Sequence, residues 1–77
     1  MSSAPVALVT GAARGIGAAI ATELAEAGFD VAIFDVIDAA ATVESARKLG
    51  RNAISITGDV TVDADRKAAL KQIDSSF

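Results

Sequence analysis

The glycines at positions 11, 15 and 17 mark a turn between an apolar run and a stretch of helical character. The run Val6–Val9 predicts a short buried strand, and residues 18–27 predict a helix. The first N–H groups of a helix have no intrahelical partner, and the helix dipole favours negative charge at that end. A strand, a glycine turn and a helix N-terminus together therefore predict a binding site for a phosphate group.

Each glycine has its own expected task in such a turn. Gly11 lets the chain leave the strand sharply, Gly15 lets the backbone come close to a pyrophosphate, and Gly17 lets the helix pack tightly on the sheet. A P-loop is excluded because its second glycine would fall on Ile16, and a Gly-x-Gly-x-x-Gly pattern that starts at Gly15 fails at Ile20. A purely structural turn is the alternative, but the acidic residues further along the chain favour nucleotide binding.

Strands and helices are expected to alternate through the rest of the chain. Residues 30–35 and 53–57 predict two further buried strands, each followed by a helix, with Asp38 and Thr61 as the expected N-caps. Gly50 stands where the second helix is expected to end. The order β-α-β-α-β-α predicts an α/β fold, namely part of a Rossmann-type doubly wound parallel sheet.

Large apolar residues at helical spacing predict which helix faces meet the sheet. They are Ile16, Ile20 and Leu24 in the first helix, and Leu70, Ile73 and Phe77 in the third. The first strand is apolar without alternation, which predicts cover on both of its faces. In the strand order 3-2-1-4-5-6 this strand also needs a fourth strand beside it. Residues 1–77 are therefore expected to be the N-terminal dinucleotide-binding segment of a single Rossmann-fold domain that continues beyond this chain.

Asp35 ends the second expected strand, at the side of a parallel sheet where ligands bind. An acid about 20 residues beyond the glycine turn typically accepts hydrogen bonds from the adenosine ribose hydroxyls. An aspartate that only caps the next turn is the alternative. Arg14 is either a solvated side chain or a cation for the 2′-phosphate of NADP. Asp35, followed by Val36 rather than by a basic residue, favours NAD.

The composition excludes several classes of function. The sequence has no Cys and no His, so disulfides, thiolate metal sites and the commonest general base are absent, and no metal site is predicted. The net charge of −3, without a basic block, argues against a nucleic-acid surface. The first apolar run is too short for a signal-peptide core or a membrane span, so no membrane association and a cytoplasmic location are expected.

The pattern Thr-Gly-x-x-x-Gly-x-Gly at residues 10–17, directly after an N-terminal strand, resembles the short-chain dehydrogenases/reductases over essentially the whole chain. The resemblance implies an NAD(P)-dependent oxidoreductase that moves a hydride between a nicotinamide cofactor and an alcohol or carbonyl substrate. This chain would supply the adenosine-pyrophosphate half of the site. The implied cofactor contacts are Gly11, Arg14, Gly15, Ile16, Gly17, Asp35, Asp59 and Val60. Asp59 and Val60 would contact adenine, although Gly58-Asp59 is equally an ordinary turn from the residues alone.

Catalytic residues cannot be assigned within this sequence. The family uses an Asn, a Ser and the pair in Tyr-x-x-x-Lys, whereas this sequence contains no Tyr. A non-catalytic NAD(P)-binding sensor on the same fold is therefore the alternative function. The expected partners are a small alcohol or carbonyl substrate, the rest of the parent chain and further copies in a dimer or tetramer, which are usual in the family.

Overall fold

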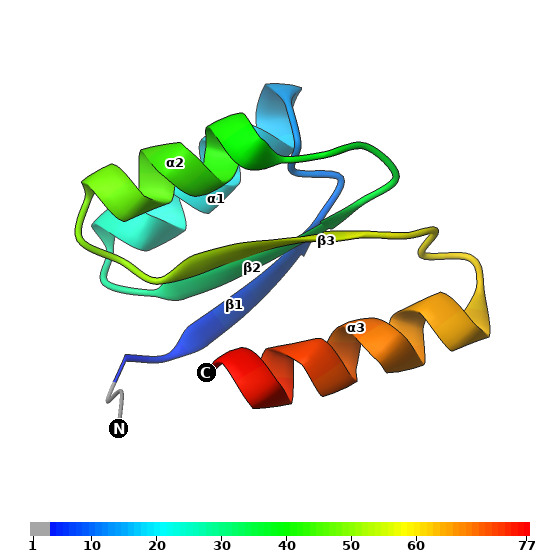
Figure 1. The fold of residues 1–77 in the computed structure, drawn as a ribbon. Coiled ribbons are helices and arrows are strands. Elements are labelled where there is room, and N and C mark those ends of the chain that lie inside the picture. Colours follow the sequence, from blue (N-terminus) through cyan, green and yellow to red (C-terminus); the bar gives the residue numbers. More distant parts are fainter. Residues whose placement is uncertain (1–3) are drawn as a thin grey trace.

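A three-stranded parallel sheet runs through the computed structural model, which describes residues 4–77 (Figure 1). Helices α1 and α2 lie on one face of the sheet, and α3 lies on the other (Figure 1). The α/β element order predicted from the sequence is confirmed, while Met1–Ser3 of the predicted segment lie outside the described residues. The elements are β1 Val6–Thr10, α1 Gly15–Glu26, β2 Asp30–Asp35, α2 Ala40–Lys48, β3 Ala53–Thr57 and α3 Asp63–Ser76.

The strand order is β1-β2-β3, so β2 is central and β1 is an edge strand. Val6 pairs with Asp30, and Val31 pairs with Ala53. The middle of β2 is fully buried, because it lies between two clusters of apolar side chains, one on each face of the sheet. Within the described residues β1 lacks the predicted cover: its residues alternate between exposed and half-buried, and Leu8 is 43% exposed, as expected if the sheet continues beyond this chain.

The predicted apolar faces of the helices need correction. Ile16 and Ile20 are exposed, and the residues of α1 that are buried are Ala21 and Ala25. α1 packs against α2 and β2 with these small side chains at the contact, so the larger apolar residues are displaced to one side, with only Leu24 packed on the core. In α3, Ala69 is buried and Ile73 half-buried, whereas Leu70 is exposed. Phe77 is half-buried.

Neither predicted N-cap caps its helix. α2 begins after Ala39, whose N–H donates to the Ser55 hydroxyl of β3 at 3.1 Å, while the Asp38 carboxylate accepts from the same hydroxyl at 3.5 Å. α3 begins after Val62, and the Thr61 hydroxyl donates instead to the Asp59 carboxylate at 2.7 Å. The Asp38 and Thr61 side chains are therefore engaged with Ser55 and Asp59, and not with the N–H groups of the helices that follow.

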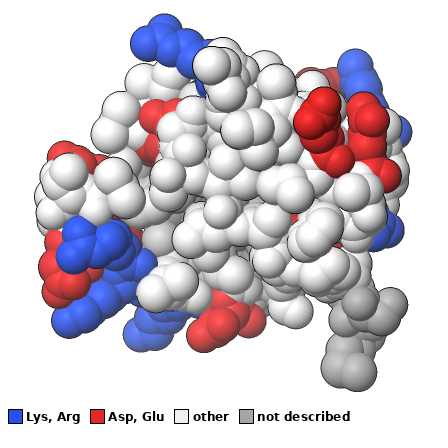
Figure 2. Space-filling model, turned by 180° about the vertical axis from the view of Figure 1, so that it is seen from behind, with Lys and Arg blue, Asp and Glu red and all other residues white. Residues whose placement is uncertain are grey.

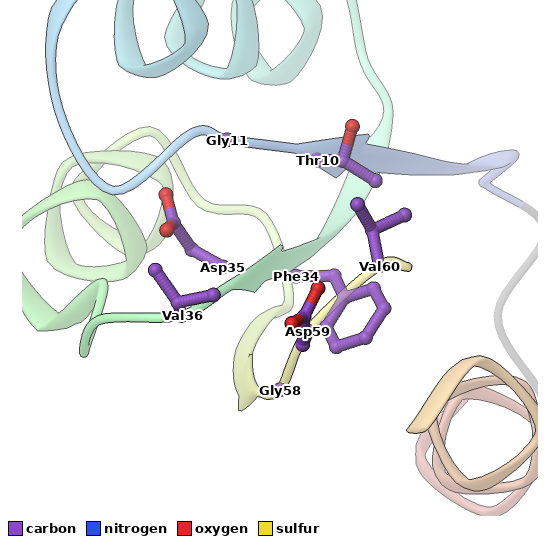
Figure 3. A pocket seen from close by; sticks show the side chains of 8 residues that line it. All are labelled: Thr10, Gly11, Phe34, Asp35, Val36, Gly58, Asp59 and Val60. Carbon is purple, nitrogen blue, oxygen red and sulfur yellow. The ribbon is translucent and has the colours of Figure 1, made fainter. Parts of the chain in front are cut away.

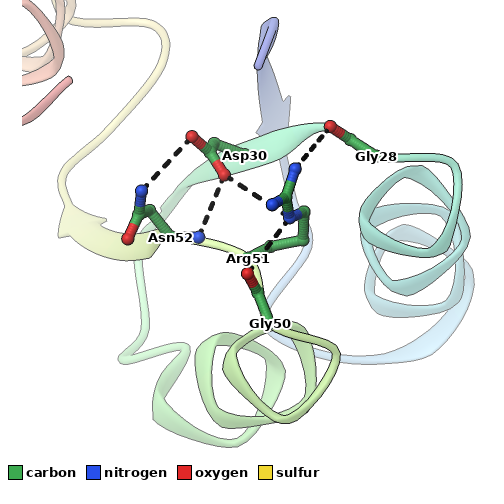
Figure 4. A network of polar contacts seen from close by, with 5 residues as sticks. All are labelled: Gly28, Asp30, Gly50, Arg51 and Asn52. Atoms are coloured by element: carbon green, nitrogen blue, oxygen red, sulfur yellow. Dashed lines mark hydrogen bonds and ion pairs between the residues drawn. The ribbon is translucent and has the colours of Figure 1, made fainter. Parts of the chain in front are cut away.

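A buried carboxylate joins the amino ends of β2 and β3 (Figure 4). Asp30 is 1% exposed, and its carboxylate accepts from the Asn52 backbone N–H at 3.0 Å and from the Asn52 side chain at 3.4 Å. Arg51 forms an ion pair with the same carboxylate at 3.9 Å and donates to the Gly28 carbonyl at 2.9 Å. This network lies at the end of the sheet opposite to the glycine turn.

Charged side chains lie around the margins of the face shown in Figure 2, and the middle of that face is uncharged. Apolar side chains also reach the surface along the unpaired edge of the sheet, where Val6 of β1 is 39% exposed. Within residues 4–77, none of the helices combines the length and hydrophobicity that a bilayer span needs.

Candidate functional site

A pocket of about 230 Å³ opens at the carboxyl ends of the three parallel strands (Figure 3). This is where an open parallel sheet binds its ligands, because the strand-to-helix connections diverge there. The volume is below the roughly 300–1,000 Å³ of a whole small-molecule site, so the pocket is suited to one part of a larger ligand. Its lining residues are Thr10, Gly11, Phe34, Asp35, Val36, Gly58, Asp59 and Val60.

The glycine turn leads from β1 into α1 beside this pocket. Gly15 has a φ of +66°, a backbone conformation that residues other than glycine rarely adopt. No atom of another part of the chain lies within 4 Å of the position that an added Cβ would take. The space in front of its backbone is therefore open, as the approach of a ligand requires. At Gly17 a Cβ would stand 2.3 Å from the Gly11 carbonyl oxygen. Gly17 thus allows the helix to approach the backbone of Gly11 and Ala12 closely.

The start of α1 has no side-chain cap. Arg14 is the N-cap residue, and its side chain makes no capping hydrogen bond. Ile16 is 81% exposed in the first turn, so no bulky neighbour covers this end of the helix. The unpaired N–H groups of a first helical turn and the helix dipole together attract an anion. Arg14 and Ile16 lie outside the lining of the pocket, on the neighbouring turn.

Asp35 stands at the last position of β2 and lines the pocket. Its Oδ2 accepts a hydrogen bond from the Ala13 N–H of the glycine turn at 3.0 Å, and its Oδ1 accepts from the Ile37 N–H at 3.4 Å. The bond from Ala13 is the main cause that lowers the pKa of Asp35, and the nearby charge of Arg14 adds to it. The carboxylate is therefore ionised at neutral pH, and its oxygens retain lone pairs that can accept from ligand hydroxyls.

Asp59 and Val60 follow β3 on the opposite side of the pocket from Asp35 (Figure 3). Oδ1 of Asp59 accepts from the Thr61 hydroxyl and from the Thr61 N–H, and the hydroxyl is the main cause that lowers the pKa of Asp59. Oδ1 of Asp59 thus serves a turn, whereas its Oδ2 accepts no hydrogen bond within residues 4–77 and is available to a ligand. Val60 is 47% exposed and offers an apolar surface next to that carboxylate.

Sequence reasoning missed two features of the site. A Cβ at Gly58 would stand 2.6 Å from the Phe34 ring, so this glycine makes room for a ring that lines the pocket. Thr42 of α2 is 5% exposed, and its hydroxyl donates to the Ala12 carbonyl of the glycine turn at 2.8 Å. A Gly directly after a strand could have indicated a close contact, whereas no pattern in the sequence links position 42 to the turn.

The geometry fits the adenosine and pyrophosphate parts of a dinucleotide. An open glycine backbone and an uncapped helix end suit a pyrophosphate, and an ionised carboxylate at a strand end suits ribose hydroxyls. The apolar surfaces of Val36 and Val60 flank the space in which a flat base could lie. These are properties of the chain itself, independent of any relative.

Residues 5–77 match the family model described as short chain dehydrogenase. The short-chain dehydrogenase/reductase eriH of Hericium erinaceus is 44% identical over 70 residues, which cover 83% of this chain and 28% of that protein. Elsinochrome reductase 1 of Elsinoe fawcettii is 49% identical over 74 residues, which cover 92% of this chain and 27% of that protein. The chain thus spans less than a third of the length of these relatives.

Among solved structures, the 3-oxoacyl-[acyl-carrier protein] reductase of Brucella melitensis in complex with NAD superposes with a TM-score of 0.91. The two sequences are 36% identical, and the match covers 100% of this chain and 30% of the reductase chain. Three observations indicate the same family: the parallel sheet, the spacing of the glycine turn, and the match over nearly all of the described residues. This chain belongs to the short-chain dehydrogenase/reductase family.

Proposed function

We propose that the chain is the N-terminal, cofactor-binding part of an NAD-dependent oxidoreductase, and we call the longer protein that contains it the parent protein. One observation carries the proposal: Asp35 and the glycine turn, which the sequence separates, are hydrogen-bonded to each other at one pocket. β1 is the edge strand of the sheet within the described residues, and its Leu8 side chain is left 43% exposed on one face; both observations support a continuation of the sheet by further chain.

In this proposal the cofactor contacts are those that the family resemblance implies, and the geometry described supports them. The backbone around Gly11, Gly15 and Gly17, with Ile16 at the helix end, would hold the pyrophosphate. Arg14 would lie beside the ribose, where its charge reaches Asp35. Asp35 would accept from the ribose hydroxyls, and Asp59 with Val60 would contact adenine. The nicotinamide would supply the hydride acceptor or donor, opposite an alcohol or carbonyl substrate, and the catalytic residues would lie outside this chain.

NAD is favoured over NADP because of the charge on Asp35. A 2′-phosphate on the ribose would come close to this carboxylate, and two like charges at short range repel each other. Arg14 opposes this preference only in part, since its charge already acts on Asp35 and lowers the pKa of that carboxyl. We expect kcat/KM of the parent protein to favour NAD by roughly ten- to a hundredfold.

The test compares both cofactors in the parent protein and in the Asp35→Asn variant. Asparagine keeps an oxygen that can accept from the Ala13 N–H, but it removes the charge, so the NAD/NADP ratio of kcat/KM should fall by roughly tenfold. A parent protein that prefers NADP would show that Arg14 outweighs Asp35. An unchanged ratio would show that Asp35 serves only the turn. Binding of NAD without any turnover of alcohols or carbonyls would favour the non-catalytic sensor.

The cytoplasmic location and the homo-oligomer, a dimer or a tetramer, stay predictions from the sequence. Size-exclusion chromatography of the parent protein with light scattering would test the second.

A further inference from the structure

The two polar groups of one peptide bond in the glycine turn are tied to two different elements. The carbonyl of Ala12 accepts from the Thr42 hydroxyl of α2 at 2.8 Å. The N–H of Ala13, which belongs to the same peptide unit, donates to Oδ2 of Asp35 at the end of β2 at 3.0 Å. A peptide unit is planar, so one hydrogen bond on each side fixes its orientation.

This peptide unit lies between two residues with little conformational restraint of their own. Gly11 and Gly15 have φ values of +67° and +66°, and a Cβ added at either position would have no neighbouring atom within 4 Å. Glycine loses more conformational freedom than any other residue when its backbone is fixed. The turn therefore depends on contacts from outside it to keep one shape, and Asp35 and Thr42 provide such contacts.

Thr42 is itself held firmly. It is 5% exposed and lies in the first turn of α2, and the start of that helix is fixed to β3 by the hydrogen bond from the Ala39 N–H to the Ser55 hydroxyl. Its hydroxyl also lies 3.2 Å from the Ala13 carbonyl oxygen. A threonine in a helix commonly donates to its own helix, as the half-buried Thr22 does to the Ala18 carbonyl at 3.0 Å, whereas the Thr42 hydroxyl donates to the turn.

We propose that Thr42 is a positioning residue for the cofactor, which fixes the Ala12–Ala13 peptide together with Asp35 and so holds the glycine turn ready before the pyrophosphate arrives. This inference rests on the proposed function and adds a residue that does not touch the cofactor. A turn that adopts the binding shape only part of the time lowers the apparent affinity by that fraction. Losing the hydroxyl should thus weaken cofactor binding without changing the chemistry that follows.

The experiment uses Thr42→Val, Thr42→Ser and Thr22→Val in the parent protein. Valine keeps the shape of threonine and removes the hydroxyl, so Thr42→Val should raise the Kd for NAD by roughly tenfold, equal to about 1.4 kcal/mol, with kcat at saturating NAD unchanged. Thr42→Ser restores the hydroxyl and should bring Kd back to within roughly threefold of the wild type. Thr22→Val is the matched control, because that hydroxyl bonds only within α1, and it should leave Kd unchanged.

A second readout needs no cofactor. Hydrogen exchange of the Ala13 amide in the cofactor-free parent protein should be slow in the wild type and in Thr42→Ser, and faster in Thr42→Val. Equal Kd values and equal exchange rates in Thr42→Val and the wild type would overturn the inference. A fall in kcat with unchanged Kd would also overturn it. If the wild type binds no NAD, the proposed function fails, while the exchange rates still decide whether Thr42 orders the turn.

Discussion

Replacing Gly15 by alanine adds one methyl group at a position where the structure separates two costs. The first cost is conformational: the φ of +66° places an alanine in the left-handed region, at roughly 1–2 kcal/mol. The second cost concerns only the ligand, because the added Cβ meets no protein atom within 4 Å and projects into the space that we assign to the pyrophosphate. Stability should therefore fall by the conformational cost alone, and cofactor affinity should fall as well because the methyl group occupies the ligand's space.

Gly50 provides the matched control. Its φ is +82°, and an added Cβ would again meet no atom within 4 Å, so Gly50→Ala should have the same conformational cost of roughly 1–2 kcal/mol. It follows α2 at the end of the sheet where Arg51 binds the Gly50 carbonyl, away from the pocket (Figure 4). The two variants thus match in backbone strain and differ in their distance from the ligand.

Urea unfolding measures the free energy of unfolding, and titration calorimetry measures the Kd for NAD, in both variants of the parent protein. The two unfolding free energies should agree within about 0.5 kcal/mol. The Kd for NAD should rise by roughly tenfold or more in Gly15→Ala and stay within roughly twofold of the wild type in Gly50→Ala. Wild-type affinity in Gly15→Ala would refute the assigned pyrophosphate position. An equal loss in Gly50→Ala would show that affinity follows stability and not contact.

Two further predictions concern stability and pH. Asp30→Ala removes the buried acceptor for Asn52 and leaves Arg51 without its ion pair, so the free energy of unfolding in urea should fall by about 2–4 kcal/mol. The exposed control Asp74→Ala should lower it by less than about 0.5 kcal/mol. Equal losses in the two variants would contradict the role of the network. The pKa values of Asp35 and Asp59 are lowered below 3.8, so their stabilising contribution is complete above pH 3.8 and is lost as the pH falls through the folded-state values. NAD affinity should therefore stay constant between about pH 5 and 8, and a marked decline with acidity in that range would contradict the assignment of Asp35.

The sequence was sufficient to predict the elements of the fold, because strong local signals mark them. β2 was predicted at its observed bounds, since a run of buried apolar residues is enclosed by Asp30 and Asp35. The helix faces were harder to predict, because large apolar residues are the usual signal of a buried face. At the contact of α1 with α2 and β2 the buried residues are alanines, and Ile16 is left 81% exposed.

The site shows the same division between local and non-local information. The positions of the turn glycines and of Asp35 follow from spacing along the chain, and the structure brings them together. Thr42 carries no such signal, because its partner in the turn is fixed only once α2 packs beside α1. Asp38 and Thr61 have the composition of N-caps, but hydrogen bonds with Ser55 and Asp59 take their side chains away from that role.

The parallel pairing of the strands sets how this unit must fold. Val6 and Asp30 are separated along the chain by the glycine turn and α1, and Val31 and Ala53 are separated by α2. Each pairing therefore closes a long loop and loses the corresponding chain entropy before any hydrogen bond of the sheet forms. β2 takes part in both closures, so no two strands can pair without it. Substitutions in β2 should consequently slow folding more than substitutions of similar cost in either edge strand.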